Sequence, residues 1–366
     1  MFPKFVLAGA LVSFAACVLA EPDATDRVAR LDLGRMVEAE RVVDTEFALE
    51  RVLERLSVEL TFHAVKNPED HPESISLKEW LALNERPEDI TQDEWRALQG
   101  FFCPERKCGG LFWSSSEYAL FDLDGNGQRD LVYVFYDGGS GYCTDHTVWR
   151  RQKEGFEKKS DGEYLELFTI CTRGSGVNTR AYWIRLRGKL YAALVYGRTG
   201  LDRVRLLRPF PHGIQFPDLD ETSQLELRVF YRYRLEDDAG QIAGDFRESL
   251  EQALNAVVPR NDENARDDFP PPLCPIPENA SEEERIGYQY GYGDPWTWEF
   301  ESIIFPLWWN GECHVVSTMT QYGWYDRNEG LQFSQEGGSF LSYPELPEAF
   351  ETLWQIKARR ETLRVE

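Results

Sequence analysis

The stretch EYALFDLDGNGQRDLVYVFY, residues 117–136, decides how the middle of this chain folds. Aromatic and β-branched residues flank a short run of Asp, Asn and Gly. Apolar runs bounded by turn residues of this kind are typical of β-strands. We therefore expect strands at Glu117–Phe121 and Leu131–Tyr136, joined by the loop Asp122–Asp130.

The loop carries oxygen-bearing side chains at alternate positions. Calcium takes about six to eight hard oxygen ligands in flexible geometry, and carboxylates that face one another are unfavourable without a cation. The sequence therefore predicts a structural Ca²⁺ site. The alternative is a plain turn, because Asp, Asn and Gly favour turns for backbone reasons alone. The candidate ligands are Asp122, Asp124, Asn126, Gln128 through its backbone carbonyl, and Asp130.

In this form the loop resembles the calcium loops of the FG-GAP and VCBS repeats of extracellular proteins. An EF-hand would place Glu at the twelfth loop position and continue as a helix, whereas Tyr133 stands there in a β-prone run. The resemblance covers about fifteen residues in one copy, and the Phe-Gly and Gly-Ala-Pro signatures of the full repeat are missing. A similar loop, followed by a Gly-rich turn with cysteine as in Gly138–Cys143, occurs in exported bacterial proteins. The resemblance implies a secreted, β-rich domain with a structural ion.

Helical patterns precede this stretch. Residues 24–65 are expected to form a helix, because four leucines recur at helical spacing on one face. Those leucines are Leu49, Leu53, Leu56 and Leu60. Two shorter helices should follow, the first near Leu77–Leu83 with Ser76 as its cap. Thr91 and Glu94 form a capping box for the second.

The rest of the chain mixes strands with further helices, so the expected fold class is α+β: a helical N-terminal region, then a mostly antiparallel β region with inserted helices. A hairpin should turn at Gly188, a strand with one wet face should cover Leu225–Leu235, and a helix should cover Asp245–Val258. The expected division is a signal peptide (1–20), a helical region (21–101), an α+β region with the calcium-type loop (102–258), a Pro- and acid-rich linker (259–286), and an aromatic-rich β segment (287–366) that ends in a helix at Pro344–Glu366.

The first twenty residues indicate export. Lys4 precedes an uncharged apolar run, and Val18-Leu19-Ala20 ends it with small residues that a signal peptidase recognises. The run is too short to favour a transmembrane anchor, which needs about twenty apolar residues. We therefore expect a periplasmic or secreted protein without a transmembrane span. The alternative is a lipoprotein anchored at Cys17.

Six cysteines remain after the signal peptide, and an even number in an exported chain predicts disulfides. Proximity in sequence favours three pairs, although six cysteines allow about fifteen pairings. The alternative is a zinc site in which Cys143 and His146 join Cys103 and Cys108 as ligands. The favoured pairs are Cys103 with Cys108, Cys143 with Cys171, and Cys274 with Cys313.

The formal charge of −23 limits the kinds of partner that this protein can bind. Phosphate backbones repel such a surface, so nucleic acid is excluded as a partner. A cation or a basic protein is favoured instead. No catalytic signature is present among the sequence motifs.

Two functional hypotheses follow. The first is a non-enzymatic exported binding protein, such as an inhibitor or an immunity-type partner, with a structural calcium loop. The second is a secreted or periplasmic hydrolase of cell-wall or extracellular glycan, because tryptophans stack on sugar rings and glycosidases use two carboxylates. The candidate carboxylates near those tryptophans are Asp294, Glu299 and Glu301.

Overall fold

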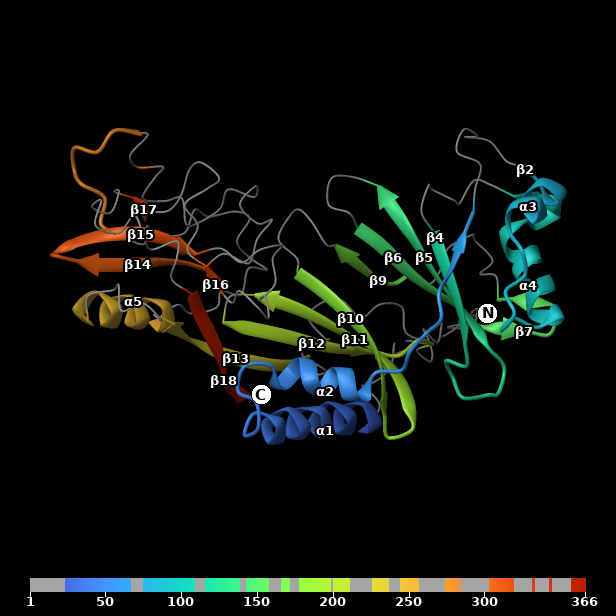
Figure 1. The fold of residues 1–366 in the computed structure, drawn as a ribbon, viewed down its shortest axis with the longest axis horizontal. Helices are drawn as coiled ribbons and strands as arrows, with labels where there is room; N and C mark the ends of the chain where they lie inside the picture. The colour runs from blue at the N-terminus through green and yellow to red at the C-terminus, as the bar shows by residue number, and fades with distance from the viewer. Residues whose placement is uncertain are drawn as a thin grey trace, which may run out of the picture.

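A computed structural model describes most of the chain (Figure 1). The predicted signal peptide lies outside the described residues, as does most of the predicted linker. The described residues are 24–66, 75–108, 116–138, 143–157, 166–171, 178–198, 200–210, 226–236, 244–256, 274–282, 285, 303–318, 331–332, 342–343 and 357–366.

A five-stranded antiparallel sheet contains the stretch quoted above. The two predicted strands are confirmed as β4 and β5, which pair along their length up to Phe121 opposite Asp130. Short β1 extends one edge of the sheet, and β6 and β9 extend the other. The sheet order is β1 (His63–Val65), β4 (Ser116–Phe121), β5 (Asp130–Gly138), β6 (Cys143–Trp149) and β9 (Glu166–Cys171).

Helices α3 (Leu77–Leu83) and α4 (Gln92–Phe102) cover one face of this sheet (Figure 1). Both predicted caps are confirmed: Ser76 and Thr91 each accept a hydrogen bond from the backbone three residues on, in complete capping boxes. The helices bury aromatic rings against the tyrosines of β4 and β5, which builds a core of aromatic pairs. Its largest members are Trp80, Trp95, Phe102, Tyr118 and Tyr133.

A six-stranded antiparallel sheet forms the second layer. The predicted hairpin is confirmed between its first two strands, where Arg187 and Gly188 have φ of 49° and 77°. The predicted strand at 225–235 is likewise confirmed as β13. The sheet order is β10 (Asn178–Leu186), β11 (Lys189–Arg198), β12 (Leu201–Leu207), β13 (Glu226–Glu236), β18 (Lys357–Val365) and β16 (Leu331–Gln332).

The prediction of one helix over residues 24–65 is wrong. The segment forms α1 (Ala24–Glu40) and α2 (Ala48–Leu56) and then runs extended into β1. Asp44 lies in the turn that separates the two helices. Its carboxylate accepts hydrogen bonds from the backbone N–H groups of Glu46 and Phe47, which holds this turn. Leu60 therefore leaves the helical face that its spacing predicted. It packs instead in the core between the two sheets.

The N-terminal helices divide between the two sheets and do not form a separate layer. Helices α1 and α2 lie on one face of the six-stranded sheet and share its core (Figure 1). Helices α3 and α4 belong to the five-stranded sheet. The opposite faces of the two sheets meet in a third core, to which Val134 and Phe168 contribute from one sheet and Trp183 and Leu194 from the other.

The predicted C-terminal helix is also wrong for the part that the structure describes. Residues 357–365 form strand β18, which pairs with β13 from Lys357 opposite Glu236 to Val365 opposite Val229. Ala358, Arg360 and Thr362 alternate inward and are buried. A tertiary pairing has overridden the local sequence preference here.

The predicted helix at Asp245–Val258 is confirmed as α5 (Gly244–Ala256). It buries Leu250 and Leu254 and packs against β13 and the hairpin of β14 (Ile303–Trp309) and β15 (Glu312–Thr318). That hairpin also pairs with β17 (Ser342–Tyr343). Smaller ladders join β2 (Ile75–Ser76) to β3 (Lys107–Cys108) and β7 (Arg151–Gln152) to β8 (Gly155–Phe156), and a 3₁₀ turn covers Pro104–Arg106. The α+β class with mostly antiparallel sheets is thus confirmed.

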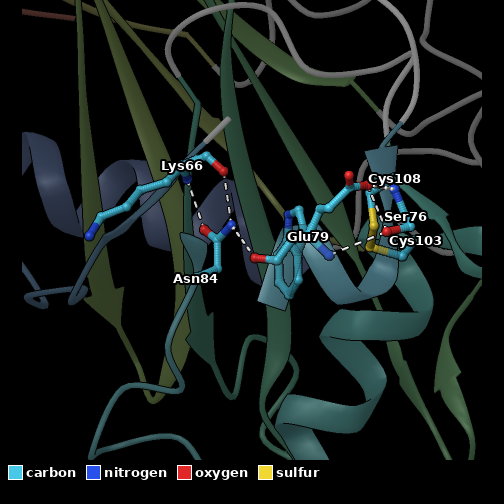
Figure 2. The surroundings of a disulfide bond; sticks show 7 residues. Lys66, Ser76, Glu79, Asn84, Cys103 and Cys108 are labelled. Atoms are coloured by element: carbon cyan, nitrogen blue, oxygen red, sulfur yellow. Dashed lines mark hydrogen bonds between the residues drawn. A yellow bond between two sulfur atoms is a disulfide. The ribbon is translucent and has the colours of Figure 1, made fainter. Parts of the chain in front are cut away.

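Two of the three predicted disulfides are present in the described residues, Cys103–Cys108 and Cys274–Cys313. Figure 2 shows the first beside the Ser76 cap and near Asn84, which exchanges two hydrogen bonds with the backbone of Lys66. This bridge rules out the zinc alternative that needed both of its cysteines as ligands. The ladder between β6 and β9 sets Cys143 opposite Cys171, and their disulfide stays a prediction.

Candidate metal centre

The loop Asp122–Asp130 connects β4 to β5 as the sequence predicted. Gly125 and Gly127 have φ of 77° and 84°, a left-handed conformation that suits glycine and lets the loop turn sharply. The Asp122 carboxylate organises this turn. Its Oδ1 accepts hydrogen bonds from the backbone N–H groups of Gly125 at 2.8 Å and Asn126 at 3.0 Å, and its Oδ2 accepts one from Gly127 at 2.9 Å.

Asp130 lies at the base of the loop with none of its surface exposed. Its Oδ1 accepts a hydrogen bond from the backbone of Arg151 at 2.7 Å, and its Oδ2 accepts one from Leu123 at 3.1 Å. Burial raises the pKa of the Asp130 carboxyl to about 6, although these backbone bonds lower it, and the carboxylates of Asp124 and Asp122 add to the rise. Two neutral donors therefore do not compensate for the loss of water around this charge.

The side chains of Asp122, Asp124 and Asp130 converge, and one oxygen from each lies within 4.8 Å of the others. Two oxygens that both touch one calcium ion at about 2.4 Å are at most about 4.8 Å apart. A carboxylate offers about four lone-pair positions, so the hydrogen bonds described above leave each group able to accept more. The arrangement fits a hard cation among the three carboxylates.

The structure brings Asp122, Asp124 and Asp130 together, whereas the roles of Asn126 and of the Gln128 carbonyl as ligands stay predictions. The Asn126 side-chain oxygen accepts a hydrogen bond from the backbone of Gln128 at 2.7 Å, which closes a local turn. Asp124 Oδ1 similarly accepts one from the backbone of Asn126 at 3.2 Å. These bonds are the geometry that the plain-turn alternative predicts, so the loop combines a turn with an acidic cluster.

Sequence reasoning missed Arg150, which lies beside the cluster. Its Nε is 3.3 Å from Asp124 Oδ2, and its guanidinium lies 4.5 Å from the centroid of the Phe210 ring. Arg150 comes from the end of β6, about twenty residues along the chain, so no local spacing in the sequence signals the contact. Its positive charge partly offsets the acidic cluster.

Arg129 ties the loop to α4. Its Nε and Nη2 donate to the two oxygens of Glu94 at 2.7 and 2.6 Å, and Nη2 also donates to the Asp89 carbonyl at 2.7 Å. The hydrogen bond from Arg129 holds the pKa of the Glu94 carboxyl at about 2, with help from the Thr91 cap. The conformation of the loop is thus coupled to the start of that helix.

A shallow hollow of about 590 Å³ opens beside the loop. Arg129, Arg151 and Lys153 bring positive charge to its lining, and no aromatic or aliphatic side chain contributes to it, unlike the pockets that usually hold small-molecule ligands. The three clustered carboxylates do not line it. The lining residues are Thr91, Glu94, Gly127, Gln128, Arg129, Arg151, Gln152 and Lys153.

The glycan hypothesis falls mostly outside the described residues. Asp294, Glu299 and Glu301 are all outside them, so their predicted role is not tested. Of the C-terminal tryptophans, Trp308 on β14 is 56% exposed and Trp309 is half-buried.

The chain matches no protein family, and comparison with characterised proteins and with solved structures returns no match. No helix among the described residues is both long enough and apolar enough to cross a bilayer.

Proposed function

We propose that this chain is an exported acidic binding protein whose fold is held by one structural calcium ion in the loop Asp122–Asp130. The convergence of three carboxylates, one of them fully buried, carries the proposal. The ion would lie among Asp122, Asp124 and Asp130. Its role is to hold β4 and β5 and, through Arg129 and Glu94, the start of α4.

Calcium explains more of this geometry than a plain turn does. Turn hydrogen bonds account for the positions of Asp122, Asp124 and Asn126, because each side chain accepts from the backbone of its own loop. Asp130 also accepts two backbone hydrogen bonds, but these do not compensate for the burial of its carboxylate, which faces the other two. A divalent cation supplies that compensation, since it replaces the lost hydration and removes the mutual repulsion.

A structural role fits the site better than a catalytic one. All three carboxylates accept hydrogen bonds from backbone N–H groups of the loop, and Asp130 also accepts one from Arg151. Ligands fixed in this way hold an ion in place and brace the chain around it. The binding role is supported by composition, because a surface with 63 acidic against 40 basic residues attracts basic partners.

Calcium should raise the melting temperature of the metal-free protein. An ion that binds only the folded state stabilises it by about 2.7 kcal/mol at a hundredfold excess over the dissociation constant. The double variant Asp122→Ala with Asp124→Ala should lose this rise. The double variant Glu248→Ala with Glu312→Ala removes the same charge outside the loop and should keep it. A melting temperature that millimolar calcium leaves unchanged would refute the calcium site.

The binding role has its own test. The native protein, immobilised with calcium present, should retain a protein partner from extracts of its own cell envelope or medium. Partners retained by electrostatic attraction should be released as salt rises above about 0.15 M, where charges are screened within about 8 Å. Recovery of no protein under low salt would count against a binding function and leave the calcium site unaffected.

A further inference from the structure

The C-terminal strand β18 closes the six-stranded sheet from the far end of the chain. It pairs with β13 over eight residue pairs, with an irregularity between Phe230 and Tyr231. On its other edge it pairs with β16 at two positions among the described residues. The turn between α1 and α2 holds it as well, because the Thr362 N–H donates to the Thr45 carbonyl at 2.6 Å and Arg41 donates to the Leu363 carbonyl at 2.9 Å.

The inward face of β18 offers little apolar surface. Ala358, Arg360 and Thr362 face the core, whereas β13 presents Tyr231, Tyr233 and Leu235 opposite them. Burial of apolar area is the main force that holds a strand in a sheet, and alanine and threonine contribute little of it. Strand β18 is therefore held mainly by its ladder and by polar contacts.

Arg360 makes the central polar contact. It is 2% exposed and lies between two buried carboxylates, paired with Glu50 of α2 and 3.6 Å from Asp202 of β12. Arg180 of β10 completes the group, 3.2 Å from Glu50 and 3.8 Å from Asp202. We name these four residues the buried quartet. Tyr231 adds a hydrogen bond to Asp202 at 2.7 Å.

The negative and positive charges of the quartet balance only when β18 is in place, because β18 supplies Arg360. Without Arg360, two buried carboxylates face the single cation of Arg180, and a buried charge without its partner is strongly unfavourable. The second oxygen of Glu50, Oε2, already has no hydrogen-bond partner among the described residues. Among the contacts of the strand, the one made by Arg360 is therefore the one whose loss leaves a buried charge without its partner.

The sequence of β18 also disagrees with its structure. KARRETLRV consists mainly of residues with high helix propensity, and only Thr362 and Val365 are β-branched. Once released, this segment has no intrinsic preference for the extended form. A conflict between local preference and tertiary structure lowers the free energy that keeps an element closed.

From these contacts we propose that β18 is a detachable closing strand, which opens locally together with the short β16 on its outer edge while β10 to β13 stay folded, and that Arg360 is the latch that holds it shut. Opening would uncover the edge of β13 over eight residues and leave the buried quartet with an excess of negative charge. An uncovered edge of this kind is a place where another strand pairs. The inference is independent of the calcium site.

Native-state hydrogen exchange on the full-length protein tests the strand directly. Amides of β18 and of the facing edge of β13 should exchange through a local opening, at least about a hundredfold faster than the slowest amides of β10 and β11. Their exchange should depend little on added denaturant, because a local opening exposes little surface. If β18 amides exchange only as fast as those of β10 and β11, with the same denaturant dependence, the strand does not open by itself and the proposal is overturned.

Arg360→Met tests the latch. The exchange of β18 should accelerate by at least about tenfold while that of β10 and β11 changes much less. Arg364→Met is the matched control on the same strand, because Arg364 is 56% exposed and pairs only with Glu366 and the Phe230 ring among the described residues. It should leave exchange of β18 close to wild type. Equal acceleration in both variants would show that Arg360 is no latch, and the wild-type comparison stands even if Arg360→Met does not fold.

Discussion

Asp130 and Arg150 bring opposite charges to the cluster of carboxylates in the loop Asp122–Asp130. Asp130 brings a buried negative charge toward Asp122 and Asp124, whereas Arg150 brings a positive charge to Asp124 from outside the loop. A calcium ion in the proposed site would neutralise the same carboxylate as the guanidinium of Arg150. The two cations would therefore compete, and we expect the arginine to lower the apparent affinity of the loop for calcium.

Replacement of Arg150 should reveal this competition. Arg150→Gln removes the charge and should tighten calcium binding by about fivefold, equivalent to about 1 kcal/mol for a partly exposed ion pair. The metal-free variant should also unfold more easily than the wild type by a similar amount. Calcium titration monitored by thermal unfolding measures both changes. Unchanged affinity would mean that Arg150 does not oppose the ion.

His146 predicts a pH dependence at the core between the sheets. Its ring stacks on Phe168 with centroids 4.5 Å apart, and its buried Nδ1 has no hydrogen-bond partner in the described part of the chain. Burial lowers the pKa of the His146 imidazole to about 4. An unfolded histidine has a pKa of about 6.5. Between these values the unfolded state binds more protons, so the stability is complete above pH 6.5 and falls as the pH drops toward 4.

The variant His146→Phe should lack this contribution. The loss of unfolding free energy between pH 7 and pH 4.5 should be about 2 kcal/mol smaller in the variant than in the wild type. Urea denaturation at the two pH values gives the comparison. Equal losses in the two proteins would show that His146 does not titrate against folding.

At the scale of elements, local signals were predictable and long-range ones were not. The caps at Ser76 and Thr91, the turn at Gly188 and the strands on both sides of the calcium loop depend on residues close in sequence, and each is confirmed. Strand β18 could not be predicted, because its partner β13 lies over a hundred residues away and its own composition favours a helix.

The candidate site shows the same division. Asp122, Asp124 and Asp130 converge because one short loop carries all three, so alternate spacing sufficed to predict them. Arg150 and the bridge from Arg129 to Glu94 come from tertiary packing, which no spacing in the sequence encodes. The break between α1 and α2 was missed because the leucine spacing begins only at Leu49, after the break, and carries no signal of the turn that Asp44 makes.

The two disulfides present in the described residues should differ in their effect on stability. A bridge constrains the unfolded chain more when it closes a longer loop. Cys274–Cys313 joins residues 39 apart and Cys103–Cys108 joins residues five apart. The double variant Cys274→Ala with Cys313→Ala should lose about 4 kcal/mol, against about 2 kcal/mol for the corresponding change at Cys103 and Cys108. Denaturant unfolding of both variants tests the order, which a larger loss at the short loop would contradict.

For the whole molecule, the two sheets are assembled in different ways. The five-stranded sheet carries the loop Asp122–Asp130, joins β4, β5 and β6 through short connections, and packs against two capped helices. The six-stranded sheet closes through β18 and is covered by α1 and α2, so its completion needs both ends of the described chain. Long-range closure of this kind is slow, because the entropy of the intervening loops must be lost first.

Calorimetric titration of calcium into the metal-free protein tests the central claim most directly. The account predicts one ion bound per chain, and no binding to the variant Asp122→Ala with Asp124→Ala under the same conditions. Binding to wild type and variant alike would place the ion elsewhere. No heat of binding, together with an unchanged melting temperature, would mean that the three carboxylates share the loop without a cation.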